Sequence, residues 1–337
     1  MSPHVLCADW NRTHGWGKPY FARSADGLTI PYGSSSLHYG LQCFEGMKAY
    51  LDKQGQVRLF RPDKNARRFK SSCERLTLPS FEEEEFIEMV KLCVRVDRNW
   101  IPMREGFSLY IRPLMIATEP TLGVGRPGHA RLAIMTSPVG PYYPSGFKPI
   151  ALMAEDRYVR AWAGGTGSFK VGGNYAPTIM VQGIAEEEAQ CSQVLWLGPN
   201  GECTEAGAMN LMFVLKGKSP NTPLEVVTAP LGALVLSGVT RDSILTLLRK
   251  DPRFLVSERT FMITELMQHI KDDNVVEVFG CGTAAIVSFV KGIWYKGKMN
   301  HVWCDPDSDK SIARQLMRQI LDIQYGVTPS DWSWIVN

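Results

Sequence analysis

The chain has 337 residues, of which 45% are hydrophobic and 21% are charged, and its formal net charge is +3 at pH 7. A chain of this length is too long for one compact core, so the sequence predicts two domains of ordinary globular composition. The small net charge argues against a nucleic-acid-binding protein. So does the shortness of the densest basic cluster, Arg67-Arg68-Phe69-Lys70.

No apolar run approaches the ~18 residues that a transmembrane helix needs, so no membrane association is expected. The N-terminal segment, MSPHVLCADWNRTHGWG, has neither the apolar core of a secretion signal nor the arginine- and serine-rich pattern of a transit peptide. We therefore expect a cytoplasmic protein, or one of the mitochondrial matrix if a longer form carries a targeting segment. The eight cysteines form no Cys-x-x-Cys motif and no zinc spacing with histidines, which indicates reduced thiols and no metal site.

The first part of the chain mixes strand and helix signals. A strand is predicted over residues 55–62, a helix over 63–76, a second helix within 79–100 and a further strand over 106–116. Ser80 and Glu83 have the spacing of a capping box at the start of the second helix. The segment SPVGPYYPSGFKP, residues 137–149, is rich in proline and glycine and marks the domain boundary.

Strand signals dominate the rest of the chain. Residues 192–207 have the pattern of a β-hairpin around a Pro-Asn-Gly turn, and further strands are predicted over 224–230 and 274–280. Helices are predicted over 237–250 and 311–326, the latter ending at Gly326. We therefore expect an α/β (α+β) fold, with a small α/β domain over residues 1–140, an interdomain loop over 141–149 and a larger β-rich domain over 150–337.

The stretch GGTGSFKVGGNYAP, residues 164–177, places Lys170 between two glycine pairs. Glycines permit unusual backbone angles and the close approach of a flat ring, and an accessible amine can act as a nucleophile toward aldehydes. The pattern predicts a reactive lysine. The alternative is a flexible loop that carries an incidental lysine.

Three segments are candidate anion sites, each with a structural alternative. Val239 and Thr240 start a predicted helix, where free N–H groups and the helix dipole favour phosphate; the alternative is a threonine N-cap. The segment FGCGTAA, residues 279–285, follows an apolar strand, and a turn at Thr283 can present N–H groups to an anion; the alternative is a tight turn between strands. Arg68 lies on a predicted helix, where the alternative is a surface arginine.

Several other side chains are candidates for a binding site. Glu205 follows the apolar strand of the predicted hairpin and lies among small residues, where a carboxylate suits a ring nitrogen; a charged residue at a strand end is the alternative. Tyr39, Phe44 and Tyr110 fit either a core or a pocket wall. Tyr142 lies on the boundary loop, which favours the wall of an interdomain cleft.

Together these segments resemble one family, the branched-chain amino-acid aminotransferases of the fold-type-IV pyridoxal-phosphate class, in their animal form. The resemblance covers nearly the whole chain and is carried, in this order, by LHYGLQCFEGMKAY, RLFRPDKNARRF, SLYIRP, EPTLGVG, PVGPYYPSG, RAWAGGTGSFKVGGNYAPT, VLWLGPNGECTEAGAMN, LSGVTRDS and EVFGCGTAA. It implies a homodimeric enzyme that uses pyridoxal 5′-phosphate to transaminate leucine, isoleucine and valine with 2-oxoglutarate. It also implies that the large domain is a β-rich pseudo-barrel.

The resemblance assigns roles to individual residues. Lys170 matches the lysine that binds the cofactor and moves a proton at the substrate Cα. The other implied cofactor contacts are Tyr175 at the ring hydroxyl, Glu205 at the pyridine nitrogen, Leu236 against the ring, and Arg68, Val239, Thr240 and Thr283 at the phosphate. The implied substrate contacts are Tyr39, Phe44, Tyr110, Val124 and Tyr142 for the side chain, Arg112 for the distal carboxylate of glutamate, and Ala284 with Thr283 for the α-carboxylate. Val124 is expected to be supplied across a dimer interface.

Two features depart from the family pattern. Mammalian relatives carry a redox-active Cys-x-x-Cys pair at positions that hold Ala285 and Ser288 here, so that thiol switch is expected to be absent. The chain also begins later than longer relatives, so we expect the pocket to lack a segment that closes one side of it.

Three alternative functions stay open from the sequence. They are a relative of altered specificity, such as a D-amino-acid aminotransferase or an aminodeoxychorismate lyase, a catalytically silent relative, and a cofactor-free Schiff-base lyase. The segments SLYIRP and CFEGMKAY argue against the first. The intact set of cofactor residues argues against the other two.

Overall fold

The computed structural model describes residues 1–104, 106–140, 148–219 and 221–337. The chain forms two compact units. The first unit contains the described residues up to position 140, together with Phe169–Gly173 and Asp322–Asn337. The second unit contains the described residues of 148–168 and 174–321. The predicted division at 1–140, 141–149 and 150–337 stays a prediction. Tyr142, one of the predicted pocket residues, lies outside the described residues.

The first unit is built on a nine-stranded sheet. Its strands are β1 (His4–Asn11), β2 (Gly15–Trp16), β3 (Tyr20–Arg23), β4 (Gln42–Phe44), β5 (Met47–Leu51), β6 (Val57–Phe60), β7 (Ser108–Ala117), β8 (His129–Val139) and β18 (Ser333–Ile335). The strand order is β18-β6-β5-β7-β8-β1-β2, with β3 paired to β1 and β4 paired to β7. The predicted strands over 55–62 and 106–116 are confirmed as β6 and β7. Because β8 extends to Val139, the predicted boundary segment of 137–149 begins inside a strand.

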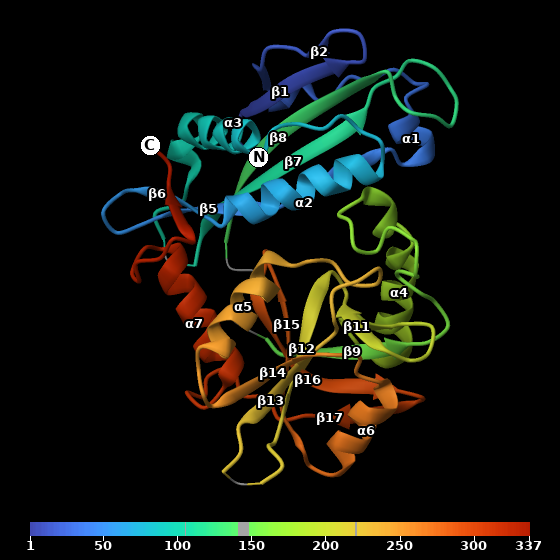
Figure 1. The fold of residues 1–337 in the computed structure, drawn as a ribbon, viewed down its shortest axis with the longest axis vertical. Coiled ribbons are helices and arrows are strands. Elements are labelled where there is room, and N and C mark those ends of the chain that lie inside the picture. The colour runs from blue at the N-terminus through green and yellow to red at the C-terminus, as the bar shows by residue number, and fades with distance from the viewer. Residues whose placement is uncertain (105, 141–147, 220) are drawn as a thin grey trace. The chain divides into compact units, whose positions relative to one another are not determined.

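Helices cover this sheet and close its core. They are α1 (Ser35–Tyr39), α2 (Pro62–Arg75) and α3 (Glu83–Val96), and α2 and α3 lie against each other (Figure 1). Phe69 of α2 and Phe86 of α3 meet at a ring-centroid distance of 5.2 Å, with Phe81 within 5.4 Å of both. Burying large apolar side chains of this kind contributes roughly 1.5–3 kcal/mol each. The sheet and the two helices therefore share one apolar core.

The predicted start of α3 is wrong in its detail. A capping box would make Ser80 the N-cap, but the helix begins only at Glu83, with Glu82 as its N-cap, and the Glu82 side chain makes no capping hydrogen bond. Ser80 instead donates a hydrogen bond from Oγ to Glu74 Oε1 over 3.2 Å. Three glutamates in the first turn suit the positive end of the helix dipole, which explains why the helix forms without the capping box.

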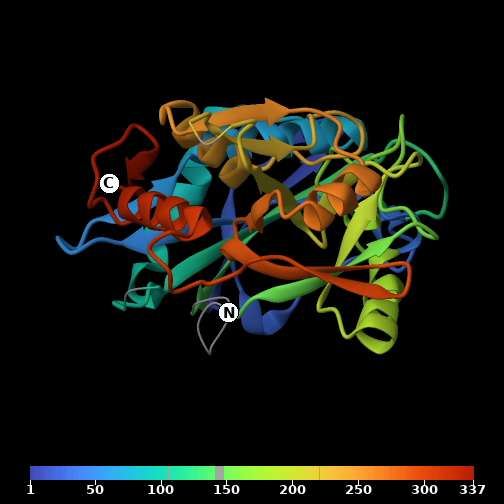
Figure 2. The same ribbon diagram turned by 90° about the horizontal axis from the view of Figure 1, so that it is seen from below.

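The second unit is built on another nine-stranded sheet. Its strands are β9 (Ile150–Glu155), β10 (Gln193–Leu197), β11 (Cys203–Ala206), β12 (Met209–Leu215), β13 (Leu224–Thr228), β14 (Phe254–Glu258), β15 (Val275–Gly282), β16 (Ile286–Tyr295) and β17 (Lys298–His301). The order is β11-β10-β9-β16-β15-β12-β13-β14, and β11 also pairs with β12, so the first six strands close into a ring. The long β16–β17 hairpin is seen in orange-red in Figure 2. The expected α/β fold with a barrel-like sheet is confirmed.

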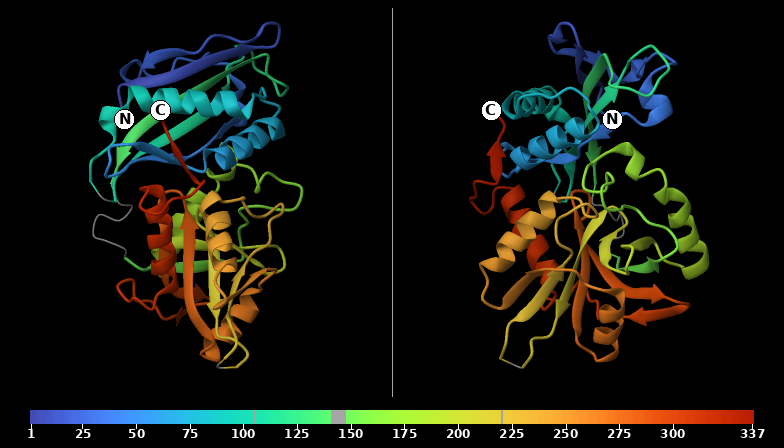
Figure 3. Two further views of the ribbon diagram at one scale, coloured as in Figure 1. Left: turned by 60° about the vertical axis from the view of Figure 1, so that its left-hand side comes forward. Right: turned by 45° about the vertical axis from the view of Figure 1, so that its right-hand side comes forward.

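Four helices accompany the second sheet: α4 (Thr178–Ala189), α5 (Val239–Arg249), α6 (Ile263–Lys271) and α7 (Ile312–Gln324), with α4 and α5 on different sides of it (Figure 3). The buried carboxylate of Glu277 fixes the start of α7, because it accepts hydrogen bonds from Ser311 Oγ over 2.6 Å and from the Ile312 N–H over 2.8 Å. Burial raises the pKa of Glu277. Gly326, at φ +67°, follows the helix, as expected for a C-terminal stop. Among the helices described, none is both long enough and apolar enough to cross a membrane.

Candidate functional site

Lys170 is held by its backbone in the first unit. Its N–H donates a hydrogen bond to Ser72 Oγ of α2 over 2.9 Å, and its carbonyl accepts one from the Phe44 N–H of β4 over 3.1 Å. The next residue, Val171, forms an antiparallel bridge with Cys43. The segment therefore lies beside β4 as a short extended stretch. The Lys170 Nζ atom lies 4.9 Å from the centroid of the Phe44 ring, which holds the amine over an aromatic face.

A buried ion pair lies on the neighbouring helix. Arg68 of α2 donates from Nε to Glu45 Oε1 over 2.6 Å and from Nη2 to Glu45 Oε2 over 2.8 Å. Asn65 Nδ2 and the Gly46 N–H donate to the same Oε2 over 2.8 and 3.0 Å. Burial alone would raise the pKa of Glu45, but the charge and hydrogen bonds of Arg68, with the charge of Lys170, hold it below its usual value. The alternative of a surface arginine at position 68 is therefore wrong.

The predicted pocket residues Phe44, Tyr110 and Arg112 form one cluster in the first unit. The Arg112 guanidinium carbon lies 4.7 Å from the centroid of the Phe44 ring and 5.2 Å from that of Tyr110, and Arg112 Nη2 donates to the Tyr110 hydroxyl over 2.9 Å. Within the described part of the chain, the buried Arg112 Nε has no hydrogen-bond partner. A Cβ atom at Gly46 would overlap the Tyr110 hydroxyl, so this glycine makes room for the phenol. The cluster places an apolar ring and a cation next to each other.

Two further predicted pocket residues lie at the surface of the first unit. Tyr39 ends α1 and is 44% exposed, and Val124, in the connection between β7 and β8, is 83% exposed. Large exposed apolar side chains are frequent at interfaces between chains. The single chain thus leaves both residues outside the cluster around Arg112.

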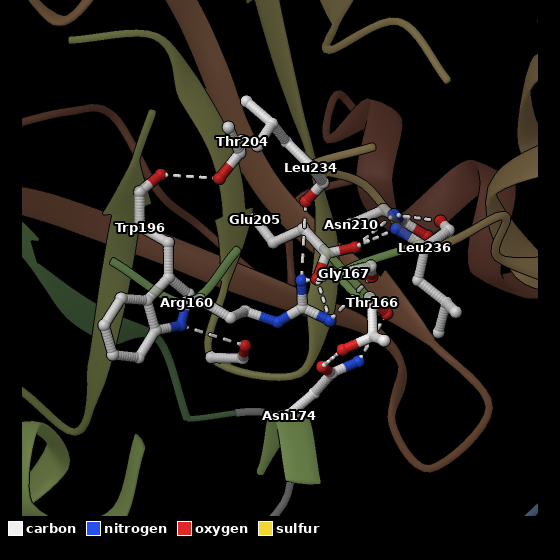
Figure 4. Close-up of polar contacts among 11 residues, drawn as sticks. Arg160, Thr166, Gly167, Asn174, Trp196, Thr204, Glu205, Asn210, Leu234 and Leu236 are labelled. Atoms are coloured by element: carbon white, nitrogen blue, oxygen red, sulfur yellow. Dashed lines mark hydrogen bonds and ion pairs between the residues drawn. The ribbon is translucent and has the colours of Figure 1, made fainter. Parts of the chain in front are cut away.

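In the second unit, Glu205 is the centre of a buried polar network (Figure 4). Its Oε1 accepts hydrogen bonds from Asn210 Nδ2 over 3.0 Å and from the Leu236 N–H over 2.8 Å. Its Oε2 lies 3.1 Å from Arg160 Nη2, and the side chains of both residues are less than 5% exposed. The Asn210 amide also donates to the Leu236 carbonyl over 2.9 Å. Glu205 does lie near the end of β11, as the alternative has it, but its carboxylate is buried and paired.

The predicted helix over residues 237–250 is confirmed as α5, and the anion site at its N-terminus stays a prediction. The helix begins at Val239 with Gly238 as its N-cap, and this glycine has no side chain to cap it. The alternative of a threonine N-cap is therefore wrong, because Thr240 is the second residue of the helix. A Cβ atom at Gly238 would overlap Asn210 Oδ1, so a glycine is required here. Leu236, two residues earlier, is buried and contacts Glu205 through its N–H.

The strand before Thr283 runs two residues beyond the predicted end at residue 280. Gly280 and Gly282 belong to β15 rather than to a turn, and only residues 283–285 connect β15 to β16. Thr283 is half-buried and Ala284 is exposed in this connection. The tight turn between strands is thus confirmed, and it places the N–H groups of residues 283–285 at one end of the hairpin. Tyr175 follows a short 3₁₀ turn, and its carbonyl accepts two bonds from Thr178, over 3.1 Å from N–H and 2.6 Å from Oγ1.

The structure therefore sorts the predicted residues by unit. The first unit brings together Lys170, Arg68, Phe44, Tyr110 and Arg112, and the second brings together Glu205 and Leu236. Tyr175, Val239, Thr240, Thr283 and Ala284 also lie in the second unit.

Sequence reasoning misses the partners that hold the site. Glu45, Arg160 and Asn210 lie in segments that carry the resemblance, but neither they nor Ser72 receive a role from it. The segments CFEGMKAY and RAWAGGTG do place charged residues among apolar and small ones. A charged residue in a segment expected to be buried needs an opposite charge. That requirement is the signal that could have identified Glu45 and Arg160.

Comparison with known proteins gives a consistent result. The profile of the family described as amino-transferase class IV matches residues 42–293. The chain is 49% identical over 340 residues to the branched-chain-amino-acid aminotransferase of Dictyostelium discoideum, covering 100% of this chain and 88% of that protein. It is 44% identical to the mitochondrial enzyme of that name from Bos taurus, over 98% of this chain and 84% of that protein, and 42% identical to the cytosolic one from Ovis aries, over 99% and 86%.

Solved structures agree with the sequence comparison. The T.th. branched-chain amino acid aminotransferase, complexed with N-(5′-phosphopyridoxyl)-L-glutamate, superposes with a TM-score of 0.74 at 25% identity, over 100% of this chain and 99% of that one. The Escherichia coli branched-chain amino acid aminotransferase has a TM-score of 0.77 at 23% identity, over 100% of both chains. The second likeness shows a shared fold.

Proposed function

Because this chain belongs to the class IV aminotransferases, and among them to the branched-chain-amino-acid aminotransferases, we propose that it transfers the amino group of L-leucine, L-isoleucine and L-valine to 2-oxoglutarate. The products are branched-chain 2-oxo acids and L-glutamate. The cofactor is pyridoxal 5′-phosphate, as in the family and in the T.th. relative solved with a phosphopyridoxyl compound. When bound, this cofactor carries the amino group and withdraws electrons from the substrate Cα.

The residues present fit this cofactor. The buried carboxylate of Glu205, paired with Arg160, suits a protonated pyridine nitrogen. The N-terminus of α5, at Val239 and Thr240, carries N–H groups that suit a phosphate, and its N-cap residue, Gly238, has no side chain that could occupy them. We assign Arg68 and Thr283 to the same phosphate, Tyr175 to the ring hydroxyl and Leu236 to the ring face.

Lys170 is the residue that we propose to carry the chemistry. Its backbone is held by hydrogen bonds to Ser72 Oγ and to the Phe44 N–H. The amine holds the cofactor between turnovers and, when released, accepts the proton from the substrate Cα. Its position over the Phe44 ring keeps it beside the proposed side-chain pocket.

One observation supports the substrate proposal above all others: an aromatic ring, a phenol and a guanidinium share one cluster. Phe44 offers apolar surface to an isobutyl-type side chain, whereas Arg112, bonded to Tyr110, offers a cation to the distal carboxylate of glutamate. The buried Arg112 Nε has no hydrogen-bond partner in the described chain, so the protein does not use every donor of this guanidinium. Both substrates of the proposed reaction can therefore use one pocket. We assign Tyr39, Val124 and Tyr142 to the same pocket and Ala284 to the α-carboxylate.

We further propose that the enzyme is a homodimer in which the connection between β7 and β8 contacts the second copy. Leu122 and Val124 expose 70% and 83% of their surface there, which a second copy would cover. Sedimentation at micromolar concentration should give twice the chain mass, and a monomer would contradict the proposal. We assign the protein to the cytoplasm, although its relatives include cytosolic and mitochondrial forms. A fluorescent fusion tests that assignment.

The reaction is tested with purified protein that is loaded with pyridoxal 5′-phosphate. L-leucine, L-isoleucine and L-valine should each give glutamate from 2-oxoglutarate, and Lys170→Ala should abolish this activity. Lys216→Ala is the matched control, because Lys216 is half-exposed and pairs with an exposed aspartate, Asp273, at the surface of the second unit. Glutamate formed from a D-amino acid and not from L-leucine would refute the specificity, and activity that survives Lys170→Ala would refute the mechanism.

A further inference from the structure

Arg160 is a buried cation to which the proposed reaction assigns no step. Its side chain is 4% exposed, and its Nη2 lies 3.1 Å from Glu205 Oε2 (Figure 4). Arg160 belongs to the segment between β9 and the glycine-rich stretch that precedes Lys170. Removing a guanidinium from water has a large free-energy cost, which is offset only where an opposite charge and further acceptors receive it. The position of Arg160 therefore needs a reason.

The charge of Arg160 affects whether the Glu205 carboxyl group is ionised or neutral. A carboxylate that is buried as deeply as Glu205 favours its neutral form unless an opposite charge compensates for the lost hydration. Asn210 and the Leu236 N–H donate to Oε1, but both are neutral donors. Arg160 supplies a full positive charge at Oε2. An ionised Glu205 is the form that can stabilise a protonated pyridine nitrogen, whereas a neutral carboxylic acid cannot.

The guanidinium is itself oriented by the backbone. Its Nη1 reaches the carbonyls of Gly167 and Leu234, each over 3.4 Å, and its Nη2 reaches the Gly167 carbonyl over the same distance. These contacts are long, so they fix the direction of the side chain more than they stabilise it. Leu234 lies two residues before Leu236, whose N–H binds the other oxygen of Glu205. The same backbone segment thus orients both ends of the ion pair.

We propose that Arg160 is a positioning residue that keeps Glu205 ionised, so that a carboxylate and not a neutral acid meets the pyridine nitrogen of the bound cofactor. The inference rests on the proposed role of Glu205. It predicts that the affinity for pyridoxal 5′-phosphate loses less on acidification in the wild-type protein than in a variant without the Arg160 charge. Loss of the Arg160 charge should make that affinity fall on the acid side, where Glu205 takes up a proton.

The experiment is a titration of the apoprotein with pyridoxal 5′-phosphate, followed by tryptophan fluorescence and by the absorbance of the bound cofactor. Between about pH 9 and about pH 6, the affinity of Arg160→Met for the cofactor should fall roughly tenfold more than the affinity of the wild-type protein does. Arg160→Lys keeps the charge and should restore the wild-type pH dependence. In a Glu205→Gln background, Arg160→Met should cause little further loss, because no carboxylate is left to ionise. Arg259→Met, which breaks a more exposed arginine–glutamate pair in the same unit, is the matched control.

A merely structural role for Arg160 gives a different pattern. Affinity would then fall by the same factor at both pH values, and the loss would be as large with glutamine as with glutamate at position 205; either result overturns the inference. If Arg160→Met does not fold, as judged from thermal melts of the apoprotein, Arg160→Lys and the double variant decide the matter. Wild-type protein that binds the cofactor without transaminating branched-chain substrates refutes the substrate proposal alone. If Arg160→Met binds the cofactor as tightly as the wild-type protein at both pH values, this inference alone is refuted.

Discussion

Glu45→Gln is a sharp perturbation of the first unit, because it removes a charge while it preserves the shape of the side chain. The carboxylate of Glu45 is fully buried and accepts hydrogen bonds from Arg68, Asn65 and the Gly46 N–H. Each carboxylate oxygen accepts one bond from Arg68. Whichever oxygen becomes an amide nitrogen in the variant, one donor of Arg68 faces another donor.

The structure sets the size of the effect. Glutamine leaves no cavity, so the loss is electrostatic: a guanidinium that is itself buried loses its counter-charge. Breaking a buried ion pair by removing one partner costs about 3–5 kcal/mol. We therefore expect the free energy of unfolding of the Glu45→Gln apoprotein to fall by about that amount. In the Glu45→Gln background, Arg68→Gln should lower the free energy of unfolding much less than it does in the wild-type protein, because it removes the unpaired charge.

The same pair predicts how stability depends on pH. The pKa of Glu45 is lower in the folded protein than in the unfolded chain, where it is about 4.3. Its contribution to stability is therefore complete above the unfolded value and is lost as the pH falls through the folded one. The wild-type protein should lose stability faster than Glu45→Gln as it is acidified below about pH 4.3.

Urea unfolding of the apoproteins, followed by circular dichroism, measures both effects. Glu88→Gln is the control, because Glu88 pairs with Lys91 at the surface and should leave the unfolding midpoint unchanged. The reasoning would be refuted if Glu45→Gln unfolded at the same urea concentration as the wild-type protein. It would also be refuted if the effects of Glu45→Gln and Arg68→Gln were additive.

Three further substitutions test other parts of the structure. Burial lowers the pKa of Lys48 to about 8, so the folded state releases this proton at a lower pH than the unfolded chain does. Between about pH 8 and 10.4, the free energy of unfolding of the wild-type protein should therefore rise by about 3 kcal/mol relative to that of Lys48→Met. Stability curves that stay parallel over this range would contradict the prediction. Gly46→Ala should displace the Tyr110 hydroxyl and raise the KM for 2-oxoglutarate more than the KM for leucine. Gly183→Ala is the control and should change neither KM, because a Cβ atom there meets nothing within 4 Å. Equal shifts of the two KM values in Gly46→Ala would argue against the role of the phenol. Phe69→Ala removes a fully buried ring and should cost about 3–5 kcal/mol in urea unfolding, and a loss below about 1 kcal/mol would show that the core collapses around the gap.

Local patterns in the sequence are sufficient for much of the fold. The helix over 63–76 is α2 to within one residue at each end, since its apolar spacing and the proline at its first position act locally. The hairpin of β10 and β11 is predictable for the same reason: the Pro-Asn-Gly turn and its flanking apolar residues are neighbours in the chain. The glycines around Lys170 likewise indicate a reactive segment, because they lie within a few residues of the amine that they leave accessible.

Long-range partners are what the sequence by itself leaves undetermined. Arg68 and Glu45 are 23 residues apart, so the pattern of α2 alone cannot show that this arginine is buried in an ion pair. The pairing of β11 with β12, which closes the ring of the second unit, depends on the path of the whole sheet. Arg160 and Glu205 meet because β9, β10 and β11 are neighbours in that sheet. Periodicity and turn chemistry act over a few residues and specify elements, whereas the charges that hold the site are paired only once distant elements have packed.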